Sequence, residues 1–227
     1  MSAYYTTEKI RQLTPYQPGK PIKELQRELG LKHVIKLASN ENPWGSGRFA
    51  LKAAEKALDE MALYPDGAAF ELKNELTKYL SVSANQITLG NGSDEIFRLI
   101  LQAFAQAPCE VICSDYAFAA FPIGALSFGC DIKRAPCPNF TLDVKAIPPL
   151  VNAQTRVIYI DNPSNPLGTA ISQTELLYLL DNIPPSVLVL LDEAYCEYVD
   201  WTSYPKSIPL LSKYPNLIIT RTYSKIH

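Results

Sequence analysis

Hydrophobic residues along the chain follow two periods, one typical of strands and one typical of helices. Short, continuously apolar runs stand at 87–89, 110–114, 156–160, 187–191 and 217–221. Strands that are buried on both faces have this pattern, which favours a parallel sheet. Helical spacing of apolar residues recurs in Leu51, Ala54, Leu58 and Met61, in Leu72, Leu76 and Tyr79, and in Ile96, Ile100, Ala103 and Phe104. Alternating strands and helices predict an α/β sandwich.

Two local signals refine this pattern. Ser172 and Glu175 form a capping box, which predicts the start of a helix over 172–180. The first 43 residues are irregular by comparison, because prolines and polar residues interrupt them, as in PYQPGKP at 15–21. We predict an extension there, with one short helix around residues 22–29.

Composition and charge narrow the possible functions. The chain has 227 residues, 47% of them hydrophobic, with 21 basic and 23 acidic side chains and a net charge of −2. No basic stripe stands out, which argues against nucleic-acid binding. No apolar run approaches the roughly 20 residues that cross a bilayer, so we expect no membrane partner. The start, MSAYYTTEKI, lacks the pattern of a secretory signal, and we expect a cytoplasmic protein.

The cysteines and histidines predict no metal site. Five cysteines lack any CxxC pair, and the chain has two histidines, His33 and His227. A zinc site needs closely spaced ligand pairs, which this sequence does not contain. We expect buried or half-buried thiols in a reducing compartment.

Polar residues follow four of the predicted strands at their carboxyl ends, where open α/β sheets bind ligands. GNGSDE (90–95) follows the first strand and opens a helix. Gly90 and Gly92 allow tight turns, and the N–H groups of the first helical turn form an anion site. An ordinary turn with Ser93 as the helix cap explains this segment equally well. Asp94 and Glu95 would repel a phosphate unless they point away or meet a cation.

The next two strand ends carry an amide and a carboxylate. In DNPSNPLGT (161–169), Asn165 stands before Pro166 and can donate a hydrogen bond to a phenolate-like oxygen; the alternative is a plain polar turn. In DEAYCEY (192–198), Asp192 ends a buried strand, where a carboxylate needs a cation such as a protonated pyridine. Asp192 is a better candidate than Glu193, which should point away, and the alternative for Asp192 is a helix cap.

The fourth strand end is TYSK (222–225), which ends in Lys225. Taken alone, this lysine could be an ordinary solvated side chain. Together, the four strand ends provide an anion site, an amide donor, a carboxylate with a tyrosine, and a serine with a lysine. This set matches what pyridoxal 5'-phosphate (PLP) requires: a phosphate grip, donors to its O3′, a partner for the pyridinium and an amine that forms the Schiff base.

These four segments, together with LTPYQPGKP, KLASNENPWG and LYPDG, resemble those of histidinol-phosphate aminotransferases within the fold-type-I PLP superfamily, and the likeness covers the whole chain. The resemblance implies that Lys225 carries PLP as a Schiff base and moves the proton between Cα and C4′. It implies that Asp192 pairs with the pyridinium nitrogen, and that Tyr195 and Asn165 hydrogen-bond O3′.

The resemblance also assigns the phosphate, the ring face and the substrate entrance. The cofactor phosphate would be held by Gly92, Ser93, Asp94 and Ser224. Phe118 would stack on the ring, and Tyr64 would reach the phosphate in the neighbouring subunit of a homodimer. Tyr16 and Asn42 would line the substrate entrance.

The implied fold is the α/β large domain of a fold-type-I PLP transferase, an αβα sandwich with a mostly parallel sheet. It would occupy residues 44–227 and be incomplete, and residues 1–43 would be an N-terminal arm or part of a small domain. Relatives continue past the lysine into a Gly-Leu-Ala-Gly-x-Arg segment, whose arginine grips the phosphate, and then into a C-terminal small domain. Both are missing here, and we do not expect the 227-residue chain alone to turn over.

The implied activity is PLP-dependent transamination of histidinol phosphate with 2-oxoglutarate or glutamate in histidine biosynthesis. Two other activities stay open, an aromatic amino-acid aminotransferase and a PLP lyase similar to threonine-phosphate decarboxylase. A non-catalytic remnant that binds PLP or nothing is a further alternative.

Overall fold

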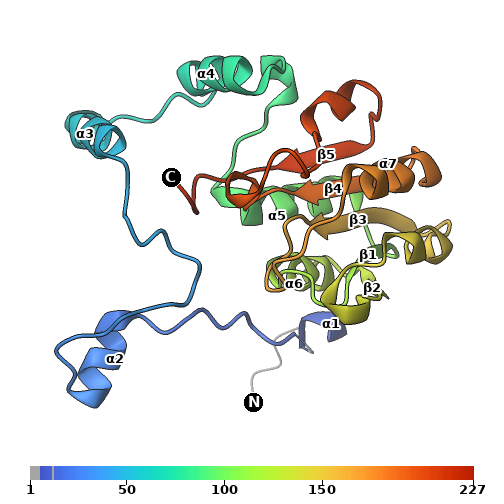
Figure 1. The fold of residues 1–227 in the computed structure, drawn as a ribbon, viewed down its shortest axis with the longest axis horizontal. Coiled ribbons are helices and arrows are strands. Elements are labelled where there is room, and N and C mark those ends of the chain that lie inside the picture. The colour runs from blue at the N-terminus through green and yellow to red at the C-terminus, as the bar shows by residue number, and fades with distance from the viewer. Residues whose placement is uncertain (1–5, 12) are drawn as a thin grey trace.

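A computed structural model describes residues 6–11 and 13–227, and its core is a five-stranded sheet of order β2-β1-β3-β4-β5 (Figure 1). Every neighbouring pair of strands is parallel, which confirms the predicted sheet. The strands are β1 (Glu110–Ser114), β2 (Asp131–Ala135), β3 (Thr155–Asp161), β4 (Leu188–Asp192) and β5 (Leu217–Thr220).

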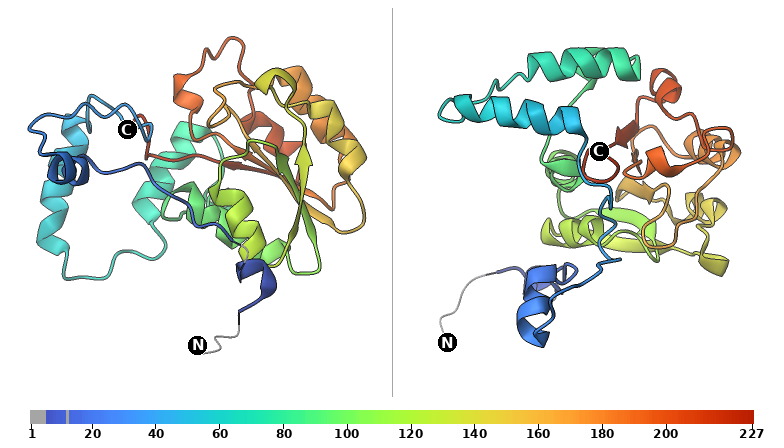
Figure 2. Two further views of the ribbon diagram at one scale, coloured as in Figure 1. Left: turned by 90° about the horizontal axis from the view of Figure 1, so that it is seen from below. Right: turned by 60° about the vertical axis from the view of Figure 1, so that its left-hand side comes forward.

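Helices cover both faces of this sheet, as the edge-on view shows (Figure 2). Helices α5 and α6 lie on one face and α7 on the other, which confirms the αβα sandwich. The α-helices are α1 (Glu8–Arg11), α2 (Ile22–Leu29), α3 (Arg48–Ala57), α4 (Phe70–Leu80), α5 (Gly92–Phe104), α6 (Ala120–Ser127) and α7 (Gln173–Asn182). Short 3-10 helices are η1 (Leu58–Glu60), η2 (Ala84–Gln86), η3 (Pro138–Phe140), η4 (Val144–Ala146), η5 (Pro148–Leu150), η6 (Cys196–Tyr198) and η7 (Ile208–Ser212).

Two apolar layers hold the sheet between its helices. On the α5 and α6 side, the rings of Phe121 and Tyr159 stack with centroids 4.3 Å apart, and Phe97 meets Tyr159 edge to face at 5.2 Å. On the α7 side, Leu176 and Leu179 pack in the core that contains the other face of β3 and β4. Strands β3 and β4 are therefore buried on both faces, and the packed sheet holds the loops that follow their carboxyl ends in place.

The expected strand at 87–89 is wrong. This segment is extended, but it pairs with no strand in the described part of the chain. A cavity of about 600 Å³ separates it from β5, and apolar side chains from both sides line this cavity, among them Ile87, Leu89 and Ile218. A strand exists only where a neighbour accepts its hydrogen bonds, and the local sequence does not show whether one is near.

Two further departures concern strand β2 and helix α5. The periodicity missed β2, because Lys133 and Arg134 interrupt its apolar pattern; charged residues of this kind are typical of edge strands. In α5 the buried residues are Phe97, Ile100 and Leu101, whereas Phe104 is exposed. The expected apolar stripe is thus correct at Ile100 and wrong at its C-terminal end, because the packing of α6 and the sheet selects the neighbouring face.

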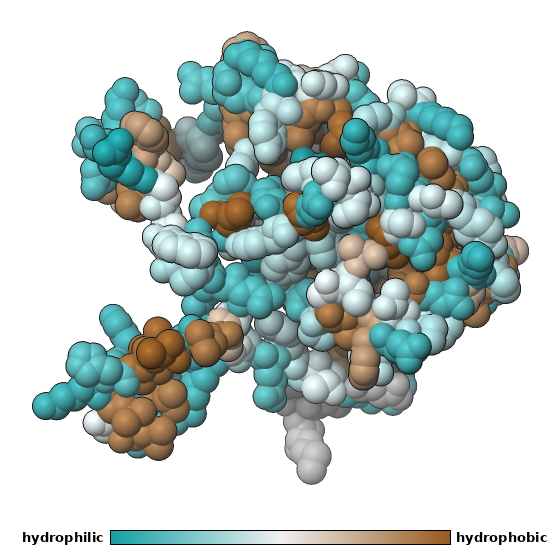
Figure 3. Space-filling view, viewed as in Figure 1, coloured by the Kyte–Doolittle hydropathy of each residue, from teal (hydrophilic) through white to brown (hydrophobic). Residues whose placement is uncertain are grey.

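The predicted helices near residues 22–29, 51–61 and 72–79 are confirmed as α2, α3 with η1, and α4. They stand away from the sheet and leave apolar side chains exposed, as the space-filling view shows at α2 (Figure 3). The most exposed apolar side chains in these parts are Ile35, Leu37, Trp44, Phe49, Met61 and Tyr64. All five cysteines are buried and free of disulfide bonds. None of the described helices is long and apolar enough to cross a membrane.

Candidate active site

The carboxyl ends of β3, β4 and β5 meet at one edge of the sheet. Asp161 is the register partner of Asp192, and Asp192 is the partner of Thr220. The three loops that begin at these residues are therefore neighbours, and the start of α5 lies beside the last of them (Figure 1). The parallel sheet brings together strand ends that are 28 and 31 residues apart in the sequence.

Asp192 is the most deeply buried carboxylate of this edge among the predicted site residues, with 4% of its surface exposed. The hydroxyls of Thr220 and Tyr159 donate to its two oxygens, at 2.9 and 3.0 Å. Burial raises the pKa of Asp192 to about 7, the two hydroxyl donors oppose this rise, and the carboxylate of Asp161 adds to it. A cationic partner would stabilise the ionised form, as the sequence interpretation required.

The phenol oxygen of Tyr195 accepts two amide hydrogen bonds. Asn165 Nδ2 donates at 3.2 Å and Asn40 Nδ2 at 2.9 Å. The backbone N–H of Asn165 donates to Asp161 at 2.8 Å, which holds the loop. Burial raises the pKa of Asp161 to about 6, and the N–H of Asn165 opposes this rise. The amide of Asn165 thus points at the phenol oxygen of Tyr195, whereas its predicted donation to a cofactor oxygen stays a prediction.

Sequence reasoning missed Asp161 and Asn40. Asp161 gave the same signal as Asp192, a carboxylate that ends a buried strand, and could have been found. Asn40 gave none, because its contact with Tyr195 spans 155 residues. Asn40 and Ser39 both have positive φ, of 52° and 73°, a conformation that costs free energy outside glycine and that clusters at functional sites.

Lys225 lies beside Tyr195, whose phenol accepts the hydrogen bond from Asn165. Its Nζ is 5.4 Å from the centroid of the Tyr195 ring, and the side chain is partly buried rather than fully solvated. Asn42 Nδ2 donates to the backbone carbonyl of Ile226 at 2.8 Å and so fixes the loop directly after the lysine. The amine, the phenol and the Asn165 amide therefore share one corner of the site.

The start of α5 forms the second corner. Gly92 has φ of +71°, and a Cβ there would lie 3.9 Å from Ser224 Oγ and 4.0 Å from Thr222 Oγ1. The two hydroxyls are themselves 2.8 Å apart. The first turn of a helix has N–H groups without partners inside the helix, and its positive dipole end attracts anions. An anion at this turn would therefore also meet the hydroxyls of Ser224 and Thr222, and we refer to this arrangement as the anion cradle.

The two acidic residues that seemed to oppose a phosphate have other partners. Asp94 pairs with Arg98 at 3.0 Å, and Glu95 accepts a hydrogen bond from the Asn91 side chain at 2.9 Å. Asn91 precedes the helix, so Ser93 lies inside its first turn and the alternative of Ser93 as N-cap is wrong. Asp94 thus meets a cation, which is the condition under which this segment can hold an anion.

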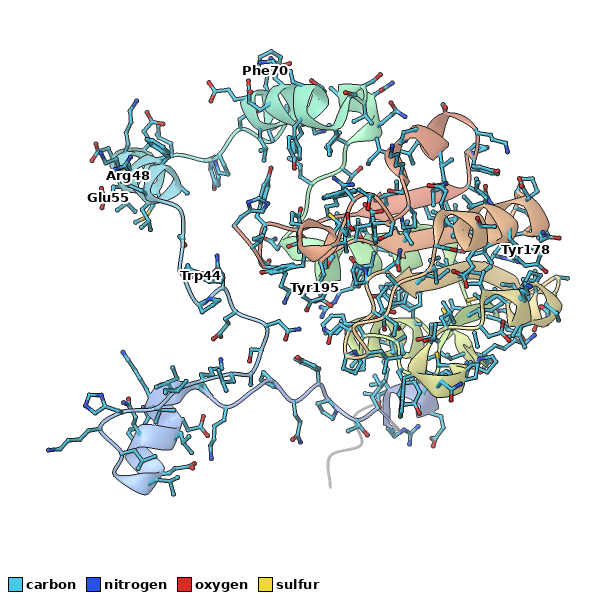
Figure 4. The ribbon with its side chains drawn as sticks, viewed as in Figure 1. Trp44, Arg48, Glu55, Phe70, Tyr178 and Tyr195 are labelled. Carbon is cyan, nitrogen blue, oxygen red and sulfur yellow. The ribbon has the colours of Figure 1, made fainter. Side chains whose placement is uncertain are left out.

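Some of the remaining predicted site residues lie close to this edge of the sheet, and others lie apart from it. Phe118 is partly buried, and its ring meets Tyr16 edge to face at 6.2 Å. Tyr64 is fully exposed, and the segment between α3 and α4 that carries it lies apart from this edge (Figure 1). An open cavity of about 870 Å³ adjoins Tyr195 and Asn165, and Trp44 lines its opposite side (Figure 4).

The residues fit PLP on the observations above. A buried carboxyl with a raised pKa suits a cationic ring nitrogen, and the Tyr195 phenol with the Asn165 amide suits a phenolate oxygen. The Lys225 amine suits an aldehyde carbon, and the cradle at Gly92, Ser224 and Thr222 suits a phosphate. No group of three or more His, Cys, Asp or Glu residues able to hold a metal ion occurs within residues 6–11 and 13–227.

Fold and site together define a parallel α/β protein whose polar groups converge at the carboxyl edge of the sheet. The chain belongs to the aminotransferase class I and II family, whose model matches residues 32–227. It is 47% identical over 218 residues to histidinol-phosphate aminotransferase 1 of Nitrosococcus oceani, covering 96% of this chain and 59% of that protein. The chain thus spans about 60% of the length of the curated relatives it matches.

Solved structures agree with this family. Histidinol-phosphate aminotransferase from Sinorhizobium meliloti, in complex with pyridoxal-5'-phosphate, superposes with a TM-score of 0.86 at 26% identity, over 99% of this chain and 60% of that one. L-threonine-O-3-phosphate decarboxylase from Porphyromonas gingivalis has a TM-score of 0.72 at 22% identity, over 85% of this chain and 56% of that one. The second likeness shows the fold alone.

Proposed function

We propose that the protein is a PLP-dependent aminotransferase that exchanges an amino group between histidinol phosphate and glutamate, with 2-oxoglutarate as the keto acid, in histidine biosynthesis. The observation that carries this proposal is the convergence of Asp192, Tyr195 and Lys225 beside the anion cradle at Gly92. The 47% identity to a protein named for this activity supports the choice of substrate.

Each residue of the site has a distinct task in this proposal. When bound, PLP supplies a protonated ring that accepts the electron pair left at the substrate Cα. Lys225 holds the cofactor covalently, and its released amine takes the proton from Cα and returns it at C4′. Asp192 keeps the ring nitrogen protonated by direct charge attraction. Because Tyr195 accepts two amide hydrogen bonds, its own proton is free to be donated to O3′, where Asn165 also donates.

The phosphate and the ring face are held by separate elements. The N–H groups at Ser93 and Asp94 and the hydroxyl of Ser224 would bind the phosphate oxygens. The N–H of Gly92 donates to the carbonyl of Gly90 at 2.8 Å, so Gly92 would contribute the space left by its missing side chain. Phe118 covers one face of the ring and excludes water from it. These residues would hold the cofactor at its phosphate, its ring nitrogen, its O3′ and its covalent link.

Tyr64, Tyr16 and Asn42 extend the proposal to assembly and substrate entry. Tyr64 reaches the cofactor phosphate of the other subunit in a homodimer, the commonest symmetry of soluble oligomers. Its full exposure, and the exposed apolar residues of the segments around it, support such an interface. Tyr16 and Asn42 line the substrate entrance, next to Phe118 and Ile226. Residues 1–43 act as an arm beside the large domain of 44–227, and the enzyme works in the cytoplasm.

The test begins with the covalent link. Borohydride reduction of the holoenzyme, followed by peptide mapping, is expected to label Lys225, and Lys225→Ala is expected to lose the label. Lys213→Ala serves as the control, because this exposed lysine pairs with Asp181 and lies outside the site. Stoichiometric labelling of another lysine in the Lys225→Ala protein would contradict the assignment.

Product analysis then separates the candidate reactions. We expect the holoenzyme to transfer the amino group of histidinol phosphate to 2-oxoglutarate faster than that of phenylalanine or tyrosine. A preference for the aromatic amino acids would favour an aromatic aminotransferase. Release of CO2 from threonine phosphate would favour a decarboxylase.

A further inference from the structure

Glu193 is a carboxylate with no task in the proposed chemistry, yet it is 0% exposed. Arg221 donates from Nε at 2.9 Å and from a terminal nitrogen at 2.8 Å, both to Glu193 Oε2. The hydroxyl of Ser207 donates to Oε1. The guanidinium of Arg221 also lies 5.8 Å from the centroid of the Trp201 ring. A buried charge of this kind persists only with such a partner.

The ion pair of Glu193 and Arg221 lies directly after the last paired residues of β4 and β5. The backbone N–H of Glu193 donates to the carbonyl of Thr220 at 2.8 Å, beyond the last register pair of the two strands, Asp192 with Thr220. Two side-chain interactions also join these two chain segments. The hydroxyl of Thr220 donates to Asp192, and the guanidinium of Arg221 donates to Glu193. After Arg221 the chain leaves the sheet and runs through Thr222 and Ser224 to Lys225.

A buried ion pair is weak support for the stability of a fold, because the cost of desolvation offsets most of the attraction between the charges. Such a pair instead constrains geometry, because the planar guanidinium of Arg221 sets the distance and the orientation between the two side chains. We propose that Glu193 and Arg221 are positioning residues that set the loop carrying Ser224 and Lys225 at the correct distance from Asp192. This inference rests on the proposed function, because the groups that it positions are those assigned to the cofactor.

The test measures PLP affinity apart from catalysis. Glu193→Gln keeps the size of the side chain and removes its charge. Arg221→Lys keeps the positive charge and loses the planar pair of N–H donors. Each is expected to raise the PLP dissociation constant of the holoenzyme by about 10- to 100-fold, the usual effect of losing a partner that orients a site group. The borohydride label at Lys225 falls in parallel. Ser207→Ala is the control, because it removes the donor to Glu193 Oε1 and keeps the ion pair with Arg221. It is expected to lower the melting temperature and to leave the affinity for PLP unchanged.

A double variant separates positioning from stability. Replacing both members of the pair, Glu193→Leu with Arg221→Met, removes both buried charges and is expected to restore the melting temperature of the cofactor-free protein. Its PLP affinity is expected to stay low. If the double variant binds PLP as wild type does, the pair is only structural and the inference is overturned. Should Glu193→Gln fail to fold, Arg221→Lys carries the same comparison, because its charge is kept.

Failure of the proposed function gives a different result. If the wild-type holoenzyme carries no label at Lys225, the proposed function is wrong, whatever the variants do. If wild type is labelled at Lys225 and both single variants bind PLP equally well, only the positioning role is overturned.

Discussion

At the scale of single residues, Asp192 links the chemistry of the site to its stability. The pKa of this carboxyl is about 7 in the folded protein, against an ordinary value of 3.8. Folding therefore favours the protonated form, and the stabilisation that this gives is complete below about pH 4 and is lost as the pH rises through about 7. A cationic ring nitrogen beside Asp192 would stabilise the ionised carboxylate and so lower the pKa of this group.

The pH dependence of stability tests this statement. Asp192→Asn in the cofactor-free protein is expected to flatten the decline of the melting temperature between about pH 4 and pH 7, because the titrating group is gone. Some decline remains, since burial also raises the pKa of Asp161 to about 6. Asp181→Asn is the matched control, because the hydrogen bond from Tyr214 lowers the pKa of that exposed carboxyl. An unchanged slope in Asp192→Asn would contradict the assignment.

The same substitution has a separate effect on turnover. Asp192→Asn is expected to retain PLP, because Lys225 and the phosphate cradle remain. Its transamination rate should fall by about 100-fold or more, comparable to the loss of a key electrostatic partner of a reacting group. Steady-state kinetics with the absorbance of bound cofactor as the control for occupancy measure this. Near-normal turnover would remove Asp192 from the chemistry.

At the scale of elements, the short loops between strands and helices are specified by local chemistry. Helix α7 starts at the predicted capping box. The N–H of Ser172 donates to the Glu175 carboxylate at 2.7 Å, and the Glu175 N–H donates to Ser172 Oγ at 3.3 Å. The buried face of α7 then packs Leu176 and Leu179 against the sheet. The cap therefore fixes the position at which this face begins.

Denaturant unfolding measures the contribution of the cap. Ser172→Ala is expected to lower the free energy of unfolding by about 1 kcal/mol, the usual cost of losing a side-chain cap. Thr174→Ala, at an exposed position of the same helix, is the control and is expected to change it by no more than about 0.5 kcal/mol. Equal effects of the two substitutions would mean that the cap adds nothing beyond helix propensity.

At the scale of the whole molecule, the helices α2, α3 and α4 carry apolar side chains that the sheet does not cover. Tyr64 is fully exposed on the segment between α3 and α4. The proposed homodimer explains both facts, because a two-fold interface would cover such surfaces and bring Tyr64 to the neighbouring site.

Complementation tests this assembly. Tyr64→Phe and Lys225→Ala homodimers are each expected to be impaired or inactive in transamination. Mixed dimers are expected to regain activity, because one site then combines the native lysine of one subunit with the native tyrosine of the other. If Tyr64 serves its own subunit, every mixed site stays defective and no activity returns.

The sequence by itself determined most of the strand-and-helix alternation, the parallel sheet and several of the residues at its carboxyl edge, although it missed β2, Asp161 and Asn40. It could do so because strand burial and helix capping are local signals, and because all parallel strands end at the same edge. The role of Tyr64 and the subunit contacts were predicted from the resemblance alone, and no contact among the described residues tests them.

Only the tertiary structure decided which groups meet. It left 87–89 without a strand partner and turned α5 to bury Phe97 and Leu101 in place of Phe104. It also joined Asn40 to Tyr195 and Glu193 to Arg221. These outcomes depend on contacts between residues 28 to 155 positions apart, or on the presence of a neighbouring element, and neither is encoded in a short stretch of sequence.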